Sequence, residues 1–205
     1  MEPSVNSLLD TDQLADRLLE VLELDIIPRT HAAVSAGNKL FGAAIVRKQD
    51  LSVVVVATNR ETENPLWHGE ISCLNDYWAM PSSARPSPSE CVFFSTHEPC
   101  SMCLSAITWS GFDRFHYFFT YQDSRDEFAI PHDLRILEEV FHCTDGRYAR
   151  SNPFWVSASI GQLIDDASND RQSALRQRSE AIRVRYAELS AIYQSRKHEG
   201  HIPLR

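Results

Sequence analysis

The chain of 205 residues is long enough for one domain with an appendage, and its apolar share of 43% is sufficient for a hydrophobic core. Its formal net charge of −8 argues against a dedicated nucleic-acid binder, because such proteins neutralise phosphates with Lys and Arg. The charge is uneven, since the tail from Asp166 onward is about +3 and the remainder about −11. A basic tail of this kind predicts either a helix that docks on the acidic body or a surface for a partner.

The N-terminal segment lacks the basic and apolar stretches of a secretion signal, and no apolar run reaches the roughly 18 residues that cross a membrane. We therefore expect a cytoplasmic protein. In a reducing compartment the five cysteines predict metal binding or redox chemistry rather than structural disulfides.

The first half of the chain is predicted to contain two helical pieces and a strand hairpin. Residues 11–24 have apolar side chains at helical spacing, with polar N-cap candidates at their start. Pro28 is expected to interrupt this helix before a second helical piece that ends at Gly37. The β-branched runs at 40–48 and 51–59 predict two strands joined by a short turn.

The second half alternates between helical and extended patterns. The unbroken apolar strand at 91–96 indicates burial on both faces. This order of elements predicts an α/β fold, a three-layer α/β/α domain around a mixed sheet. The other predicted elements are a Pro- and Ser-rich loop at 81–90, a strand at 114–121, and helices at 68–80, 101–111, 132–141 and 169–197.

The last predicted helix lies outside this core and has one apolar stripe. The stripe predicts a face that packs on the domain or, alternatively, on a second subunit. Its members are Leu175, Ile182, Tyr186, Leu189 and Tyr193.

Two short motifs have the residue types of a zinc site. Cys100 and Cys103 lie in the first turn of a predicted helix, where free N–H groups and the helix dipole stabilise thiolates, and Pro99 suits a helix start. His68 begins the preceding helix and offers a third ligand, with Glu70 two residues further on. Zinc takes three or four Cys, His or carboxylate ligands, and a catalytic site keeps one position open for water.

Two other interpretations of Cys100 and Cys103 stay open. A structural zinc site would require a fourth ligand and would have no use for Glu70. A redox pair of the thioredoxin type would leave His68 and Glu70 unexplained. His97 is expected only to flank the site. The remaining cysteines are expected to be inert, mostly buried thiols: Cys73, Cys91 and Cys143.

The combination His-x-Glu…Pro-Cys-x-x-Cys resembles the signature of the cytidine deaminase superfamily, over about residues 37–141. Within it "HGEIS" is similar to fungal cytosine deaminases, whereas "EPCSMCLSAI" is similar to guanine and tRNA adenosine deaminases. The resemblance implies a mixed five-stranded sheet with an added C-terminal helix, and a homodimer. It also implies one Zn²⁺ per chain on His68, Cys100 and Cys103, with Glu70 as the proton carrier.

The resemblance further implies substrate contacts. Asn59, at the end of the second strand, matches the asparagine that hydrogen-bonds the ring in free-base deaminases, although a turn residue is the alternative. An acidic residue after the strand at 114–121 would read ring N–H donors. The expected contacts are Asn59, Gly69, Glu98 and either Asp123 or Asp126.

The sequence therefore predicts a zinc-dependent hydrolytic deaminase of a free nucleobase or similar amino-heterocycle, cytosine-like or guanine-like. Two alternatives remain: a nucleoside, nucleotide or tRNA adenosine-type deaminase, and a non-catalytic zinc-binding partner subunit. We expect residues 1–150 to form the zinc deaminase domain and residues 151–205 to form an extension that is mainly one long helix.

Overall fold

The computed structural model describes residues 10–199 and 201–204, and its centre is one five-stranded sheet in the order β2-β1-β3-β4-β5. The pairs β2/β1 and β1/β3 are antiparallel, whereas β3/β4 and β4/β5 are parallel, so the sheet is mixed as predicted. The strands are β1 (Gly42–Arg47), β2 (Val53–Thr58), β3 (Cys91–His97), β4 (Arg114–Phe119) and β5 (Val156–Ser159).

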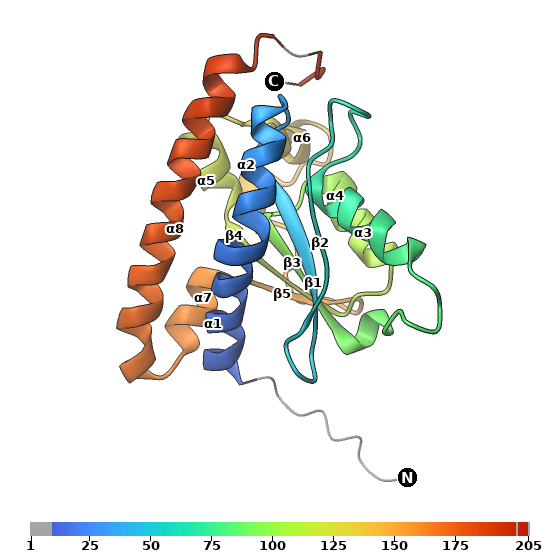
Figure 1. The fold of residues 1–205 in the computed structure, drawn as a ribbon, viewed down its shortest axis with the longest axis vertical. Coiled ribbons are helices and arrows are strands. Elements are labelled where there is room, and N and C mark those ends of the chain that lie inside the picture. The colour runs from blue at the N-terminus through green and yellow to red at the C-terminus, as the bar shows by residue number, and fades with distance from the viewer. Residues whose placement is uncertain (1–9, 200, 205) are drawn as a thin grey trace.

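Helices cover both faces of the sheet, which confirms the three-layer α/β/α architecture (Figure 1). One face carries α1 (Thr11–Val21), α2 (Ile27–Ser35), α7 (Ile160–Asp166) and α8 (Asn169–Arg196). The other face carries α3 (Gly69–Ala79) and α4 (Ser101–Trp109). Two further helices follow β4, α5 (Tyr121–Asp126) and α6 (His132–Glu139), and short 3₁₀ turns occupy Pro88–Glu90 and Thr144–Gly146.

The central strands are buried on both faces, as the unbroken apolar run at 91–96 predicts. Successive side chains of a strand point to opposite faces. In β1, Ala44 and Val46 therefore join the core under α1, α2 and α8, while Ala43 and Ile45 join the core under α3 and α4. The sheet thus separates two hydrophobic cores.

The expected interruption at Pro28 is wrong. The chain stays helical from α1 through a π-helical turn at Leu22–Ile26 into α2. Pro28 lies in the first turn of α2, directly after the π-helical turn, so the proline that lacks an N–H donor lies where the regular α-helical hydrogen bonding is already altered. Asp10 caps the start of α1 by accepting from the backbone N–H of Asp12 at 3.0 Å.

The C-terminal helix packs on the same chain. All five members of its predicted stripe are buried in the core that also contains residues of α1 and α2. The boundary at residue 150 stays a prediction; β5, which follows it, pairs with β4 in the main sheet.

Among the described residues, no helix has both the length and the apolar character needed to cross a membrane. The expectation that the chain has no targeting signal depends partly on residues 1–9, which lie outside the described residues.

Candidate metal centre and its cavity

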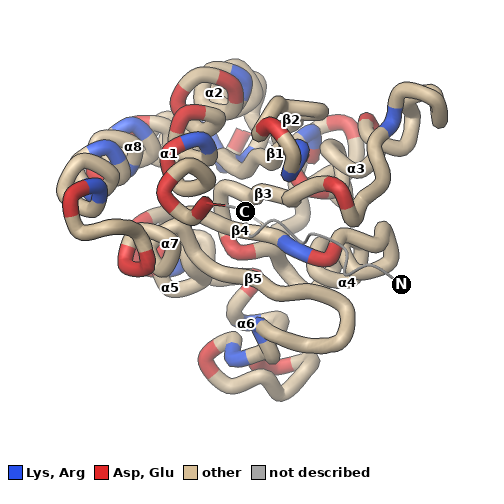
Figure 2. Tube along the Cα trace, turned by 90° about the horizontal axis from the view of Figure 1, so that it is seen from below, with Lys and Arg blue, Asp and Glu red and all other residues tan. Residues whose placement is uncertain are grey.

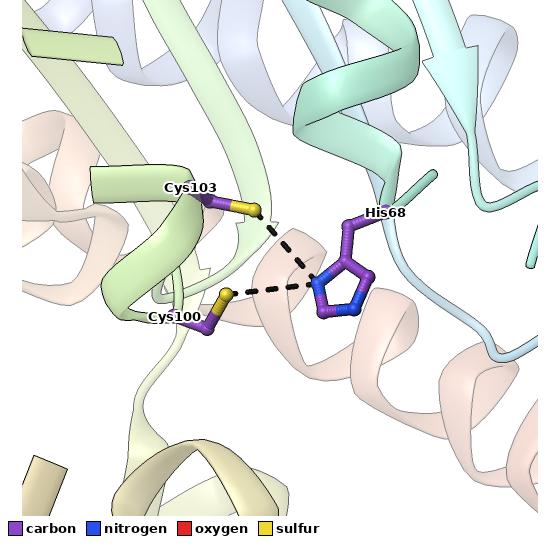
Figure 3. Close-up of side chains that lie close together, drawn as sticks. All are labelled: His68, Cys100 and Cys103. Carbon is purple, nitrogen blue, oxygen red and sulfur yellow. Dashed lines mark hydrogen bonds between the residues drawn. The ribbon is translucent and has the colours of Figure 1, made fainter. Parts of the chain in front are cut away.

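The two motifs meet where α3 and α4 begin. His68 is the N-cap residue of α3, and Cys100 is the N-cap residue of α4, directly after β3 and the Glu98-Pro99 link. Cys103 follows in the first turn of α4. Figure 3 shows both sulfur atoms facing the same nitrogen of the His68 ring.

The separations of these three side chains suit a zinc ion. His68 Nδ1 lies 3.6 Å from Cys100 Sγ and 3.8 Å from Cys103 Sγ. Tetrahedral zinc, with Zn–S near 2.3 Å and Zn–N near 2.05 Å, places such atoms about 3.6 Å apart. Within residues 10–199 and 201–204, this is the one group of three potential metal ligands of this kind. The donor set therefore fits zinc with a fourth position left for a non-protein ligand.

The surroundings favour negative sulfur at Cys100. A hydrogen bond from Cys103 lowers the pKa of the Cys100 thiol well below its usual range, despite burial, and His68 adds to the effect. Burial opposes the charged form of His68, but the Cys100 thiolate outweighs it and raises the pKa of His68 to about 9. Burial raises the pKa of Cys103. A thiolate ready at the N-cap of α4 is the form that binds zinc.

Glu70 is the second residue of α3, and its side chain is buried. Its Oε1 accepts a hydrogen bond from Ser95 Oγ at 2.9 Å. Burial, followed by the negative charge of Cys100, raises the pKa of Glu70 above its usual range. A carboxyl group that can hold a proton thus lies beside the metal ligands.

A cavity of about 280 Å³ opens at the metal centre. Its wall includes two of the three potential metal ligands, His68 and Cys100, so a metal ion held by these residues would lie next to the cavity. Much of the remaining wall is apolar, and its polar groups come mainly from the turn before β1, the loop after β2 and the start of α6. The other lining residues are Lys39, Phe41, Glu61, Pro65, Leu66, Ser101, Met102, Ile130, His132, Asp133, Ile136, Ile202, Pro203 and Leu204.

Two of the predicted substrate contacts lie near this centre. Asn59 is fully buried, and its Oδ1 accepts a hydrogen bond from the backbone N–H of Gly69, the first residue of α3. Gly69 itself packs on the backbone of β1, because a Cβ there would lie 2.7 Å from Gly42 Cα. Both residues therefore tie the start of α3 to the sheet.

The other predicted contacts point elsewhere. Glu98 is buried with its carboxylate bound to Tyr121, Tyr148 and Arg150. Asp123 caps α5 through Thr120 and pairs with Arg183 of α8 at 3.4 Å. Asp126 is exposed and pairs with Arg125. The acidic residues that do line the cavity are Asp133, at the start of α6, and Glu61, in the loop after β2.

Sequence reasoning missed Asp133 and the pair Lys39–Glu61. An acid in the first turn of a helix is common for electrostatic reasons, so the pattern of 132–141 does not distinguish Asp133 from a solvent-exposed acid. Burial, followed by the negative charge of Cys100, raises the pKa of Asp133 to about 8.

Four residues were expected to take no part in the site. His97 packs among aromatic rings, Cys73 and Cys91 are buried, and Cys143 is half-buried.

Part of the chain is similar to proteins of known family. Residues 25–119 match the cytidine and deoxycytidylate deaminase zinc-binding region. The tRNA-specific adenosine deaminase of Rickettsia bellii is 30% identical over 95 residues, 45% of this chain and 64% of the relative. A probable cytosine deaminase of Schizosaccharomyces pombe is 28% identical over 107 residues, 52% of this chain and 62% of the relative.

A solved guanine deaminase from Nitrosomonas europaea is 20% identical, with a TM-score of 0.48, covering 81% of this chain and 84% of that one. The chain spans somewhat less than two thirds of the length of the curated relatives given above. The matched region contains all three metal ligands, so this part of the chain is similar to the zinc-binding region of cytidine and deoxycytidylate deaminases.

Proposed function

We propose that the chain is a zinc-dependent hydrolytic deaminase that converts the amino group of a free nucleobase or similar amino-heterocycle to a carbonyl and releases ammonia. The observation that carries this proposal is the position of the metal ligands. His68 and Cys100 line a small cavity, and the buried carboxyl of Glu70 lies beside them.

The chemistry divides between the metal and Glu70. Bound zinc supplies a Lewis acid that makes water nucleophilic near neutral pH. Glu70 would take a proton from the attacking water and pass it to a ring nitrogen. It would then take the proton of the newly formed hydroxyl group and deliver it to the amine, so that the carbonyl forms as ammonia leaves. Because Ser95 Oγ donates to Oε1, we assign these proton transfers to Oε2.

The cavity favours a small planar substrate. Its volume of about 280 Å³ lies just below the usual range for ligand sites, roughly 300–1,000 Å³. Asp133 offers an acceptor for a ring N–H, the role that Asp123 or Asp126 was expected to fill. The names of the relatives include cytosine, guanine and tRNA adenosine deaminases, and the proposal retains both cytosine-like and guanine-like bases.

The arginines of α8 disfavour the tRNA alternative. Figure 2 shows basic and acidic residues side by side along α8 and its neighbours. Arg178 pairs with Asp16 and Glu23, at 2.7 and 2.6 Å, and Arg183 pairs with Glu127 at 2.8 Å. Phosphate binding would compete with these pairs. This agrees with the expectation that the basic tail docks on an acidic body.

A screen for ammonia release tests the proposal. The zinc-loaded chain is offered cytosine, guanine, adenine, aminotriazines, the matching nucleosides and tRNA. We expect release from at least one free base. Glu70→Gln should keep one zinc per chain and lose turnover by at least about 100-fold, since general acid–base catalysis contributes that much or more.

Other outcomes identify the alternatives. Activity on nucleosides or tRNA alone would replace the free-base proposal with the corresponding rival. Zinc binding without ammonia release from any compound would favour a partner subunit. Near-normal turnover by Glu70→Gln would contradict the role of Glu70.

The assembly and the compartment complete the proposal. Trp109 at the end of α4 is 92% exposed and Trp78 on α3 is 46% exposed, on a face that Figure 1 shows uncovered by another helix. Exposed aromatic residues are typical of interfaces, and we propose a homodimer there, testable by light scattering.

A cytoplasmic setting keeps Cys100 and Cys103 reduced, as zinc binding requires.

A further inference from the structure

Glu61 and Lys39 form a buried ion pair in the wall of the cavity. Lys39 Nζ lies 2.7 Å from Glu61 Oε1, and the two side chains are 6% and 1% exposed. Removing two charges from water costs several kcal/mol per ion, and the attraction offsets this only with additional hydrogen bonds. A contribution to the stability of the fold therefore does not by itself explain this buried ion pair.

Glu61 is hydrogen-bonded to Asn59 and faces the metal ligand His68. Its Oε2 accepts a hydrogen bond from Asn59 Nδ2 at 2.6 Å, while the Oδ1 of that amide accepts from the backbone N–H of Gly69. Its Oε1 lies 3.7 Å from Nε2 of His68. One carboxylate thus contacts the amide that holds the start of α3 and faces the histidine that precedes it.

The two nitrogens of the His68 ring face different partners. Nδ1 faces the sulfur atoms of Cys100 and Cys103, and the other ring nitrogen points away from them (Figure 3). When Nδ1 binds zinc, the neutral ring carries its proton on Nε2, which faces Glu61. In metal sites, a carboxylate opposite the second nitrogen fixes the tautomer and the orientation of the ring.

We propose that Glu61, held by Lys39, is a positioning residue that orients His68 toward zinc and fixes the amide of Asn59. Lys39 keeps the Glu61 carboxylate from becoming a metal ligand itself. A carboxylate can itself bind zinc, and the ammonium group bound to Oε1 keeps Glu61 on the outer side of the imidazole. The role concerns metal binding, so it holds whichever heterocycle the chain acts on.

Zinc affinity tests the proposal without reference to turnover. The full chain is titrated with zinc against a chromophoric chelator. We expect Glu61→Gln to bind zinc about 10- to 100-fold more weakly than wild type, as is typical when an outer partner of a metal ligand is lost. The absorption spectrum of the cobalt-loaded variant should shift as well, because a misdirected His68 changes the ligand field.

Glu63→Gln is the matched control. Glu63 lies two residues further along the same loop, and its side chain is exposed. The same chemical change there should leave zinc affinity and the cobalt spectrum at wild-type values. Thermal unfolding of the metal-free variants shows whether a loss of affinity reflects a loss of folding.

A second variant covers the case in which Glu61→Gln fails to fold because Lys39 is left unpaired. Lys39→Met/Glu61→Gln removes both charges, a change that buried pairs tolerate far better than the loss of one partner. It should fold and show the same loss of zinc affinity. Wild-type affinity in either folded variant would overturn the positioning role. Because zinc binding does not depend on ammonia release, this outcome is distinguishable from failure of the proposed deaminase activity.

Discussion

Glu98, the residue before Pro99, is a buried carboxylate that fixes the link between β3 and α4. Tyr148 and Arg150 donate to its Oε1 at 2.9 and 2.8 Å, and the backbone N–H of Tyr121 reaches its Oε2 at 3.3 Å. All three donors follow β4 in the chain, so Glu98 connects the link between β3 and α4 to α5 and to the segment before β5. Its contacts give it a structural role, and its expected role as a substrate contact stays a prediction.

Replacing Glu98 should therefore reduce stability more than replacing an exposed acid. Glu98→Ala leaves the donors of Tyr148 and Arg150 without their acceptor, and we expect the free energy of unfolding to fall by about 2–4 kcal/mol. Urea denaturation of the full chain measures it. Glu139→Ala, which removes an exposed pair with Arg135, should change stability by less than about 0.5 kcal/mol. Equal effects of the two substitutions would contradict the structural role of Glu98.

At the scale of elements, the metal centre depends on how closely α3 approaches the sheet. The first residue of α3, Gly69, lies against Gly42 of β1, and a Cβ there would meet three backbone atoms of Gly42 at 2.7 to 3.0 Å. Backbone atoms of a central strand cannot move aside as a flexible side chain can. The glycine therefore sets the position of His68, the residue before it.

Gly69→Ala should destabilise the chain by about 1–3 kcal/mol, because overpacking against a rigid neighbour forces backbone shifts. Gly161→Ala is the control, since Gly161 also lies in the first turn of a helix but its Cβ would meet Ser159 Oγ at an ordinary 3.6 Å. There alanine should be neutral or stabilise by up to about 1 kcal/mol, through its lower backbone entropy in the unfolded chain. Thermal melts of both variants give the comparison, and a neutral Gly69→Ala would show that α3 can move away from β1.

The elements also differ in how well the sequence predicts them. Long periodic segments such as 169–197 and unbroken apolar strands such as 91–96 are predicted because burial dictates their pattern. The sequence does not locate β5 (Val156–Ser159), because a four-residue edge strand with serines at alternate positions has no distinctive pattern. Likewise, the zinc ligands are recognisable from their spacing, whereas Asp133 and Glu61 join the cavity only through tertiary packing.

At the scale of the whole molecule, buried histidines make the stability of the fold depend on pH. The core under α8 surrounds His97, whose ring packs against Phe41, Phe119, Phe128 and Tyr186. Burial lowers the pKa of His97 well below its usual value. Unfolding would expose such a histidine to water and to protonation, so these buried rings link stability to pH.

His116 on β4 allows this linkage to be measured. Burial, only partly offset by the hydrogen bond to the carbonyl of Ala158, lowers the pKa of His116 from 6.5 to about 4. Between these two pH values the folded ring stays neutral while the unfolded ring binds a proton. The free energy of unfolding should therefore fall as the pH drops from 6.5 towards 4, by up to about 1.4 kcal/mol per pH unit for this residue.

His116→Gln keeps a donor for Ala158 but removes the titration. Between pH 6.5 and about 4 its free energy of unfolding should depend on pH less steeply than that of wild type, and above pH 7 the two curves should run parallel. Urea denaturation at half-unit pH intervals measures the difference. His31→Gln serves as the control, because His31 is already exposed in the folded chain and the substitution removes no buried ring. The contrary outcome is a difference in the free energy of unfolding between wild type and His116→Gln that stays constant over the whole pH range. It would mean that His116 has the same pKa in the folded and the unfolded chain, which contradicts its burial.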